Sequence, residues 1–294
     1  MADSIFITGG TGNTGQAVLR RLAADEAFRD AKITGLCRPG GRGERLLPFG
    51  VTIAGGDASS AESLRKVYRG EPVVIHLSSI FHAGAVLDGC RGMRRLVAVS
   101  STRVYSKTWA RAKEIEEAER AIERSGVPST ILRPTMIYGT AEDRNISKLI
   151  RLVAKYGIVP LPGGGKSVFQ PVHADDLAGC ILAALKTPAS AGKSYDVPGG
   201  SAHSLREIVE IISRGLGKKA LIVPFPIALA ETAAGTLEKL LPRPVVQREQ
   251  IERLREDKRY DFSEAAKDLG YAPRSFANGV AGRPFPRFSK AVFI

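Results

Sequence analysis

The sequence predicts an α/β fold in which a doubly wound parallel sheet carries helices on both faces and is followed by a smaller C-terminal region. Two observations support this prediction. Short, β-rich apolar runs alternate with helical patterns through the first half of the chain, and a glycine-rich turn joins the first run to the first helical pattern. Strands that alternate with helices are typical of βαβ units, whose right-handed crossovers place helices on both faces of a sheet.

Six apolar runs are expected to be strands, in the order SIFITG, KITGLC, VTIAGG, PVVIHLSS, RRLVAVSS and PSTILRP. Between the first two runs, TGQAVLRRLAADEAF repeats apolar residues at helical spacing. After Pro134 the alternation is weaker, but three further helices are expected within NISKLIRLVAKYG, FQPVHADDLAGCILAALK and HSLREIVEIISRGLG.

These patterns divide the chain into two regions. We assign residues 1–140 to the first domain, with about 166–190 returning to it, and 141–165 and 191–294 to the smaller region. The tail at about 280–294 shows no clear periodicity, and on this interpretation it is mobile.

Composition limits the cellular context. The three cysteines, Cys37, Cys90 and Cys180, form no CxxC pair, which favours a reducing compartment and indicates neither a disulfide framework nor a metal site. The N-terminal residues contain no basic segment before an apolar one, so we expect no signal peptide and a cytoplasmic protein. The longest apolar run, ALIVPFPIALA, contains two prolines and is shorter than the roughly 20 residues of a membrane span.

The chain is strongly basic. Lysine and arginine outnumber aspartate and glutamate by 43 to 30, a formal charge of +13. Such a charge could attract nucleic acid, a membrane surface or a polyanionic substrate. The basic residues are dispersed, however, and no RNA-stacking motif accompanies them. We therefore interpret most of the charge as a solvated surface and do not expect a nucleic-acid partner.

A glycine motif follows the first expected strand directly. Gly9, Gly12 and Gly15 form G-x-x-G-x-x-G immediately before the first helical pattern. In that position one glycine permits a tight turn, a second lets the backbone approach a pyrophosphate, and a third lets helix and strand pack closely. The amides at the start of the helix then offer an anion site. The stretch therefore predicts a loop that binds the phosphates of a nucleotide.

The spacing resembles the TGxxGxxG of the short-chain dehydrogenase/reductase superfamily, especially its extended and atypical branches. Further stretches, in order, resemble the NAD-dependent epimerase/dehydratase branch: GGD, VVIHLSS, VAVSSTRVY, TILRPTMIYG, QPVHADDLAG and RYDFSEAAKDLGYAPR. The resemblance extends to about residue 280. It implies a Rossmann-type first domain that binds a nicotinamide cofactor and a C-terminal region that binds a small-molecule substrate, and homodimers are common in such proteins.

The second expected strand bears on the choice of nucleotide. Where NAD-preferring relatives have an acid that binds the ribose, this chain has Cys37 followed by Arg38. NADP is therefore favoured, and NAD stays open. Together with the glycine loop, the resemblance implies these cofactor-binding residues: Gly9, Thr11, Gly12, Asn13, Thr14, Gly15, Arg38, Asp57, Ala58, Leu77, Ser78, Ser79, Pro134, Thr135, Met136 and Ile137.

The catalytic motif departs from the family pattern. By resemblance, Ser101 occupies the position of the catalytic hydroxyl, but the Tyr-x-x-x-Lys that tunes a phenol for proton transfer is missing. One register puts Trp109 and Lys113 there, and another puts Arg111 and Ile115 there.

We take three residues as catalytic candidates: Ser101, Tyr105 and Lys113. The first hypothesis is an NAD(P)-dependent oxidoreductase or epimerase/dehydratase-like enzyme that acts on a small carbonyl, hydroxyl or nucleotide-sugar substrate. The alternative is a non-catalytic NAD(P)-binding sensor or accessory subunit.

Overall fold

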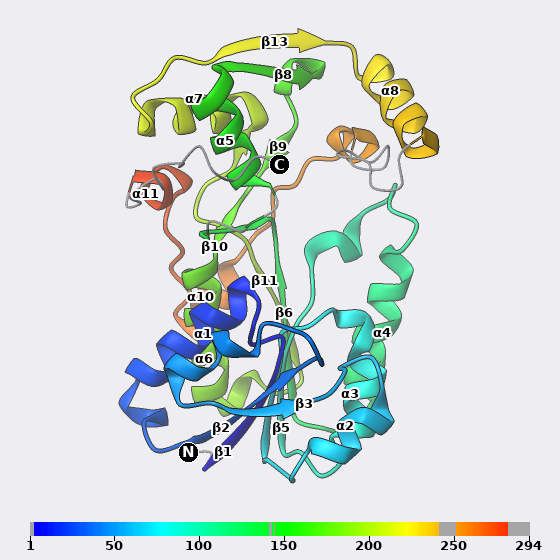
Figure 1. Cartoon of the computed structure of the whole chain (residues 1–294), viewed down its shortest axis with the longest axis vertical. Coiled ribbons are helices and arrows are strands. Elements are labelled where there is room, and N and C mark those ends of the chain that lie inside the picture. The colour runs from blue at the N-terminus through cyan, green and yellow to red at the C-terminus, as the bar shows by residue number, and fades with distance from the viewer. Residues whose placement is uncertain (1–2, 141–142, 144, 241–250, 282–294) are drawn as a thin grey trace. The chain divides into compact units, whose positions relative to one another are not determined.

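The computed structural model describes residues 3–140, 143, 145–240 and 251–281 (Figure 1). The chain forms two compact units. Unit 1 comprises residues 1–137, 174–198 and 260–273, and unit 2 comprises 138–173, 199–259 and 274–294. From residue 282 onward, the tail that we expected to be mobile lies outside the described residues.

Among the described residues, unit 1 contains a parallel sheet of seven strands in the order β11-β6-β5-β4-β1-β2-β3. The strands are β1 (Ser4–Thr8), β2 (Lys32–Cys37), β3 (Thr52–Gly55), β4 (Val73–His76), β5 (Arg95–Val99), β6 (Ser129–Pro134) and β11 (Lys193–Val197). All six strands expected from the sequence are present, and β11 is the one that the sequence analysis missed. The order reverses between β1 and β4, which is the switch point where parallel α/β sheets bind ligands.

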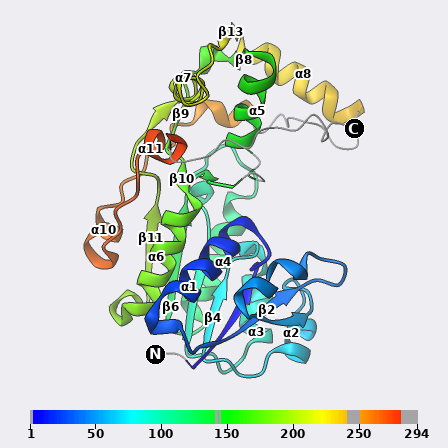
Figure 2. The same ribbon diagram turned by 60° about the vertical axis from the view of Figure 1, so that its left-hand side comes forward.

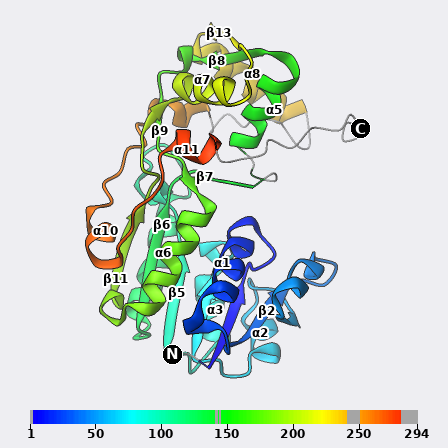
Figure 3. The ribbon, with the colours of Figure 1, turned by 90° about the vertical axis from the view of Figure 1, so that its left-hand side faces the viewer.

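Helices cover both faces of this sheet. On one face α1 (Asn13–Ala24) and α6 (Ala174–Lys186) lie side by side (Figure 2). The other face carries α2 (Ala61–Val67), α3 (Ala83–Gly89) and α4 (Ala112–Arg124) (Figure 1). A short helix, α10 (Ser263–Leu269), lies beside β11 (Figure 3). The doubly wound α/β fold predicted from the sequence is confirmed.

Burial on both sides explains why the strands are apolar runs. Ile5, Phe6 and Ile7 follow one another in β1 and are all fully buried, because each face of the strand meets a helical layer. On the face of α2, α3 and α4, Phe6 packs edge-to-face on Tyr68 at 5.5 Å between ring centroids. The central strands are thereby held rigidly, with their carboxyl ends at one edge of the sheet.

Unit 2 is built from shorter elements. Its helices are α5 (Ile146–Tyr156), α7 (Leu205–Gly215), α8 (Ile227–Leu240) and α11 (Phe276–Ala281). Its strands include β8 (Ile158–Pro162), β9 (Val168–Phe169), β10 (Val172–His173), β12 (His203–Ser204) and β13 (Leu221–Phe225), and β7 (Ile137–Tyr138) lies at its first boundary. β8 pairs with β13 in parallel, and β9 pairs with β12 in antiparallel. A capping box between Ser204 and Glu207 starts α7.

Single 3-10 turns connect several elements: η1 (Glu26–Phe28), η2 (Gly43–Arg45), η3 (Leu47–Phe49), η4 (Ile80–His82), η5 (Thr102–Tyr105), η6 (Gly163–Gly165), η7 (Pro188–Ser190) and η8 (Arg253–Arg255). Of these, η4 and η5 follow the carboxyl ends of β4 and β5, the edge of the sheet where the predicted site lies.

Within the described ranges, no helix combines the length and the apolar character needed to cross a membrane.

Candidate nucleotide-binding site

The glycine loop approaches the end of β4 more closely than a side chain would allow. Gly9 has a φ of +74°, and a Cβ built on it would lie 2.6 Å from both the carbonyl carbon of Leu77 and the amide nitrogen of Ser78. A Cβ on Gly15 would lie 2.4 Å from the Gly9 carbonyl oxygen. Both positions therefore require glycine. Gly9 needs it for the positive φ and the close approach to β4, and Gly15 needs it for the packing of α1 against the loop.

The loop ends at an uncapped helix. Gly12 is the N-cap of α1 and has no side chain to accept a hydrogen bond from the first turn. Thr11, Asn13 and Thr14 are half-buried around this turn, which carries no acidic residue. Free amides and the positive end of the helix dipole suit a phosphate group.

The loop after β2 is bonded to the glycine loop. The Gln16 side-chain amide donates to the carbonyl oxygens of Gly10 and Arg45, both at 3.1 Å. The Arg45 guanidinium in turn donates to the Thr11 carbonyl oxygen at 3.0 Å. These bonds fix the segment that carries Arg38 relative to the glycine loop, and they place a cation beside Thr11. No sequence motif indicates this role for Gln16.

Arg38 and Asp57 follow neighbouring strands, β2 and β3, and their charges interact. Oδ1 of Asp57 accepts from the backbone amide and the hydroxyl of Ser59, at 2.9 and 2.8 Å. The pKa of Asp57 is lowered, first by the backbone bond from Ser59, then by its hydroxyl, with Arg38 and His82 contributing through charge. Asp57 is therefore ionised at neutral pH and forms an Asx-type turn.

A buried polar cluster lies beneath the glycine loop. The Thr8 hydroxyl is 2.8 Å from Nδ1 of His76 and 3.2 Å from the Ser78 hydroxyl. Burial, together with the charge of the neighbouring His82, lowers the pKa of His76 to about 4. The His76 imidazole is therefore neutral at physiological pH. Leu77 adds a backbone bond to the Thr8 carbonyl oxygen at 3.0 Å, so the ends of β1 and β4 are firmly joined.

Other residues expected at the cofactor also lie at carboxyl ends of strands or just beyond them. Ala58 is buried after β3, whereas Ser79 is exposed after β4. Pro134 ends β6, and its carbonyl oxygen accepts from the Thr102 hydroxyl at 3.4 Å. Thr135, Met136 and Ile137 follow it and are half-buried. The positions at β1, β3, β4 and β6 therefore all belong to the carboxyl edge of one parallel sheet.

The three catalytic candidates differ in their surroundings. Ser101 is half-buried at the start of η5, and its hydroxyl accepts from the Arg103 amide at 3.2 Å. Lys113 is exposed in the first turn of α4. The Tyr105 hydroxyl donates to Asp196 at 3.0 Å and accepts from Arg133 at 3.1 Å. Partial burial and Asp196 raise the pKa of Tyr105, the opposite of the lowering that acid-base catalysis requires.

An aromatic and cationic cluster surrounds Trp109, which one of the two registers puts at the position of the missing tyrosine. Trp109 is only 8% exposed, and its ring centroid lies 6.3 Å from that of Phe81. The guanidinium of Arg103 lies 5.0 Å from the Trp109 ring centroid, and that of Arg111 lies 3.9 Å from the Phe81 ring centroid. An indole donates one hydrogen bond and cannot transfer a proton as a phenol does.

A buried ion pair, also missed in the sequence analysis, supports this edge of the sheet. The Arg133 guanidinium on β6 donates to both carboxylate oxygens of Glu119 on α4, with the shortest bond at 2.7 Å. The Ser100 hydroxyl at the end of β5 donates to the same carboxylate. The pair therefore fixes α4 to two strands whose ends border the predicted site.

Comparison with known proteins agrees with this geometry. The family described as NAD(P)H-binding matches residues 9–188, more than half of the chain. The chain belongs to this family. Its expected similarity to the short-chain dehydrogenase/reductase superfamily is confirmed by a Bos taurus relative described as short-chain dehydrogenase/reductase family 42E member 1, 26% identical over 76% of this chain and 61% of the relative.

Two relatives share one description, NADH dehydrogenase [ubiquinone] 1 alpha subcomplex subunit 9, mitochondrial. The Arabidopsis thaliana protein is 40% identical over 119 residues, which are 40% of this chain and 29% of the relative. The Dictyostelium discoideum protein is 25% identical over 71% of this chain and 63% of the relative. The chain thus spans less than two thirds of either relative.

An enzyme is also among the relatives. The 2-alkyl-3-oxoalkanoate reductase of Shewanella oneidensis is 24% identical over 91% of this chain and 81% of the relative. Among solved structures, an NADPH-dependent quinone oxidoreductase from Escherichia coli matches with a TM-score of 0.74 at 18% identity, covering 94% of this chain and 98% of that one. At that identity the structure supports the NAD(P)H-binding fold alone.

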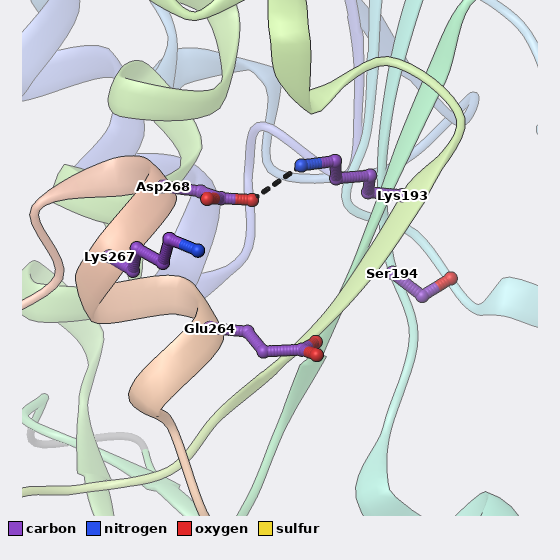
Figure 4. A pocket seen from close by; sticks show the side chains of 5 residues that line it. All are labelled: Lys193, Ser194, Glu264, Lys267 and Asp268. Atoms are coloured by element: carbon purple, nitrogen blue, oxygen red, sulfur yellow. Dashed lines mark hydrogen bonds and ion pairs between the residues drawn. The ribbon is translucent and has the colours of Figure 1, made fainter.

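Unit 1 of this NAD(P)H-binding chain also has a polar hollow, but it lies at the other edge of the sheet. Lys193, Ser194, Glu264, Lys267 and Asp268 line it, and Lys193 pairs with Asp268 at 2.7 Å (Figure 4). Lys193 is the first residue of β11, so the hollow lies at the amino edge. Parallel sheets bind cofactors at the carboxyl edge, so this hollow does not lie where a cofactor is expected.

Proposed function

We propose that unit 1 binds NADPH and that the protein is an oxidoreductase that reduces a small carbonyl compound. The observation that carries the proposal is the glycine loop. Gly9 makes a backbone approach that no other residue could make, the loop ends at an uncapped helix, and Gln16 and Arg45 bond it to the arginine-bearing loop after β2. This combination suits a dinucleotide phosphate better than it suits an ordinary turn.

We assign each part of the nucleotide to residues at the carboxyl edge. The amides between Gly9 and Gly15 would hold the pyrophosphate, and the charge of Arg38, with Arg42 and Arg45 on the same loop, would attract a 2′-phosphate. Asp57 and Ala58 would contact the adenine. The segments 77–79 and 134–137 would border the nicotinamide ring, which supplies a hydride when the nucleotide is bound.

Ser101 is the residue that we propose to contact the substrate carbonyl. Its hydroxyl is half-buried at the end of β5 and is oriented by the Arg103 amide. A hydroxyl there can donate a hydrogen bond to a carbonyl oxygen as negative charge develops on it. Tyr105 is less suited, because its raised pKa and its bond to Asp196 disfavour proton release.

A second candidate function is a nucleotide-binding subunit without turnover. The observation in its favour is the cluster around Trp109, because one register of the sequence puts this indole, which cannot transfer a proton, at the position of the family's tyrosine. The relatives described as subunits of NADH dehydrogenase are consistent with such a role.

Calorimetric titration with NADPH and NADH tests the binding proposal. We expect NADPH to bind more tightly, and Arg38→Ala to lose about tenfold to a hundredfold in NADPH affinity while NADH affinity is retained. Arg29→Ala is the matched control, since Arg29 is an exposed arginine paired only locally with Glu26 in the structure. Absence of binding by either nucleotide would refute the assignment of the loop.

Turnover separates the two candidate functions. NADPH oxidation is followed with a panel of 3-oxoalkanoates, simple ketones and quinones, using the wild type and Ser101→Ala. Activity that falls about a hundredfold or more in Ser101→Ala supports the reductase. Tight NADPH binding with no oxidation across the panel supports the non-catalytic subunit instead.

A further inference from the structure

Unit 2 exposes an apolar face on its parallel strand pair, β8 and β13. In the register of this pair Leu221 lies opposite Ile158 and Val223 lies opposite Pro160. Ile158, Leu221 and Val223 are 50%, 62% and 41% exposed, respectively. The alternate residues of β8, Val159 and Leu161, are buried toward α5 and α7, which pack against that strand (Figure 1). We call Ile158, Pro160, Leu221 and Val223 the β8–β13 face.

This face reverses the usual pattern of a surface sheet. A strand pair with one buried side normally carries polar residues on the other side, because those side chains meet water. Here all four residues of the β8–β13 face are apolar, and Tyr156, 60% exposed, precedes the face at the end of α5. A contiguous exposed apolar surface of this kind indicates a docking surface.

Lysines surround one end of the β8–β13 face. Lys155 lies beside Tyr156, with its amine 4.9 Å from the ring centroid. Lys218 donates to the Ala154 carbonyl oxygen at the end of α5, and Lys219 follows it in the turn before β13. All three lysines are exposed. This end of unit 2 therefore presents positive charge next to aliphatic side chains.

The sequence around the face contains no compensating acid. Residues 145–168 and 211–230 include no aspartate or glutamate, although they contain lysines and arginines. The second of these segments holds the longest apolar run of the chain, ALIVPFPIALA. Its prolines and its length rule out a membrane-spanning helix, and the structure uses it for β13 and the start of α8.

We propose that the β8–β13 face docks on the surface of an anionic phospholipid bilayer. The aliphatic side chains would enter the boundary between head groups and acyl chains, Tyr156 would lie at head-group level, and Lys155, Lys218 and Lys219 would contact lipid phosphates. Aliphatic, aromatic and basic residues in this arrangement are typical of proteins that bind in the membrane interface. The docking involves only unit 2 and does not depend on nucleotide binding by unit 1.

The charge around the β8–β13 face favours an anionic bilayer over a partner protein or a second copy of this chain. Protein–protein interfaces are depleted in lysine relative to the rest of the surface, whereas three lysines gather at the end of this face. A second copy of the chain, related by a two-fold axis, would bring the lysines of both copies to one interface with no acid from either segment to pair with them.

Co-sedimentation of the full chain with vesicles tests the proposal. We compare vesicles of pure phosphatidylcholine with vesicles that also contain phosphatidylglycerol. The expected result is strong binding only to the mixed vesicles, weakening as salt is added. Absence of binding to the mixed vesicles, or equal binding to both kinds, would overturn the proposal.

Substitutions locate the contact. Leu221→Asp is expected to weaken binding at least about tenfold, since it removes an apolar anchor and adds a repelled charge. Replacing Lys155, Lys218 and Lys219 together with alanine is expected to cost about fivefold per lysine. Leu47→Asp and Lys66→Ala, at exposed positions of unit 1, are the matched controls and should bind as the wild type does.

Two further readouts keep the result interpretable. Unaltered thermal unfolding and NADPH affinity of Leu221→Asp would show that the chain is folded. Mass measurement in solution addresses self-association: a wild-type dimer that Leu221→Asp converts to a monomer would assign the face to a second copy and overturn the membrane proposal. Binding of Leu221→Asp to mixed vesicles at wild-type strength would also overturn the membrane proposal.

Discussion

The Tyr105 hydroxyl donates a hydrogen bond to Oδ1 of Asp196 at 3.0 Å, which ties the end of η5 to strand β11. Arg133 completes the arrangement by donating to the same hydroxyl. A tyrosine held between a carboxylate and a guanidinium, with a raised pKa, has the environment of a structural residue rather than of a proton donor.

Replacing this tyrosine tests that interpretation. Tyr105→Phe is expected to cost about 0.5–1.5 kcal/mol of unfolding free energy, the usual worth of a lost hydrogen bond, and to leave NADPH affinity unchanged. Urea unfolding and calorimetry measure the two quantities. Tyr156→Phe, at an exposed position of unit 2, is the control. If the protein turns over and Tyr105→Phe abolishes that turnover, the original prediction of a catalytic Tyr105 is correct instead.

Gly9 in the glycine loop can be compared with a second glycine that has nearly the same positive φ. Gly9 and Gly40 have φ values of +74° and +71°, but in the described part of the chain a Cβ built at Gly40 has no atom within 4 Å other than those of Gly40 and its two chain neighbours. Gly40→Ala should therefore cost about 1–2 kcal/mol for the left-handed conformation alone. Gly9→Ala should cost about 1–3 kcal/mol more, because its Cβ meets the Leu77 and Ser78 backbone, and it should abolish NADPH binding. Equal losses of stability in the two variants would contradict the close approach.

The central part of the fold could be predicted from the sequence because its information is local. The strands β1, β4, β5 and β6 are buried on both faces over most of their length, so each contains a short apolar run that the sequence shows directly. The strand that was missed, β11, lies at the edge of the sheet, where Lys193, Ser194 and Asp196 interrupt the apolar pattern. An edge strand with polar residues is hard to distinguish from a loop.

The candidate site could be predicted only in part, because some of its contacts join residues that are far apart in the chain. The spacing of the glycines at 9, 12 and 15 predicts a phosphate loop, and the chain belongs to an NAD(P)H-binding family. The bonds from Gln16 and Arg45 join residues 29 and 34 positions apart in the chain, and no local pattern reports them. The cofactor and catalytic roles of individual residues stay predictions.

The buried histidine under the glycine loop predicts a pH dependence of stability. The pKa of His76 is lowered to about 4 from its usual 6.5, so the unfolded chain binds a proton between these values and the folded chain does not. The contribution of His76 to the unfolding free energy is therefore complete above about pH 6.5 and is lost as the pH falls toward 4. The total loss amounts to about 2–4 kcal/mol.

Unfolding free energies measured at neutral pH and at about pH 5 give the slope of stability against pH. His76→Asn is expected to flatten it, whatever its effect on absolute stability. His203→Gln, which alters a half-buried histidine of unit 2, should leave the slope as in the wild type. An unchanged slope in His76→Asn would assign the pH dependence to other groups.

Two ion pairs involve α4, one to Arg133 on β6 and one within the helix, and because they differ in burial their loss should differ greatly in its cost to the unfolding free energy. The side chains of Arg133 and Glu119 are 19% and 4% exposed, whereas those of Arg120 and Glu116 are 54% and 48% exposed. Glu119→Gln should cost about 3–5 kcal/mol of unfolding free energy, because Arg133 keeps a buried charge without its partner. Glu116→Gln, the same change three residues earlier, should cost at most about 1 kcal/mol. A double-mutant cycle with Arg133→Met separates the energy of the ion pair from the penalty of leaving the Arg133 charge buried and unpaired. If the double variant is more stable than Glu119→Gln alone, the unpaired charge accounts for most of the cost, rather than the lost attraction.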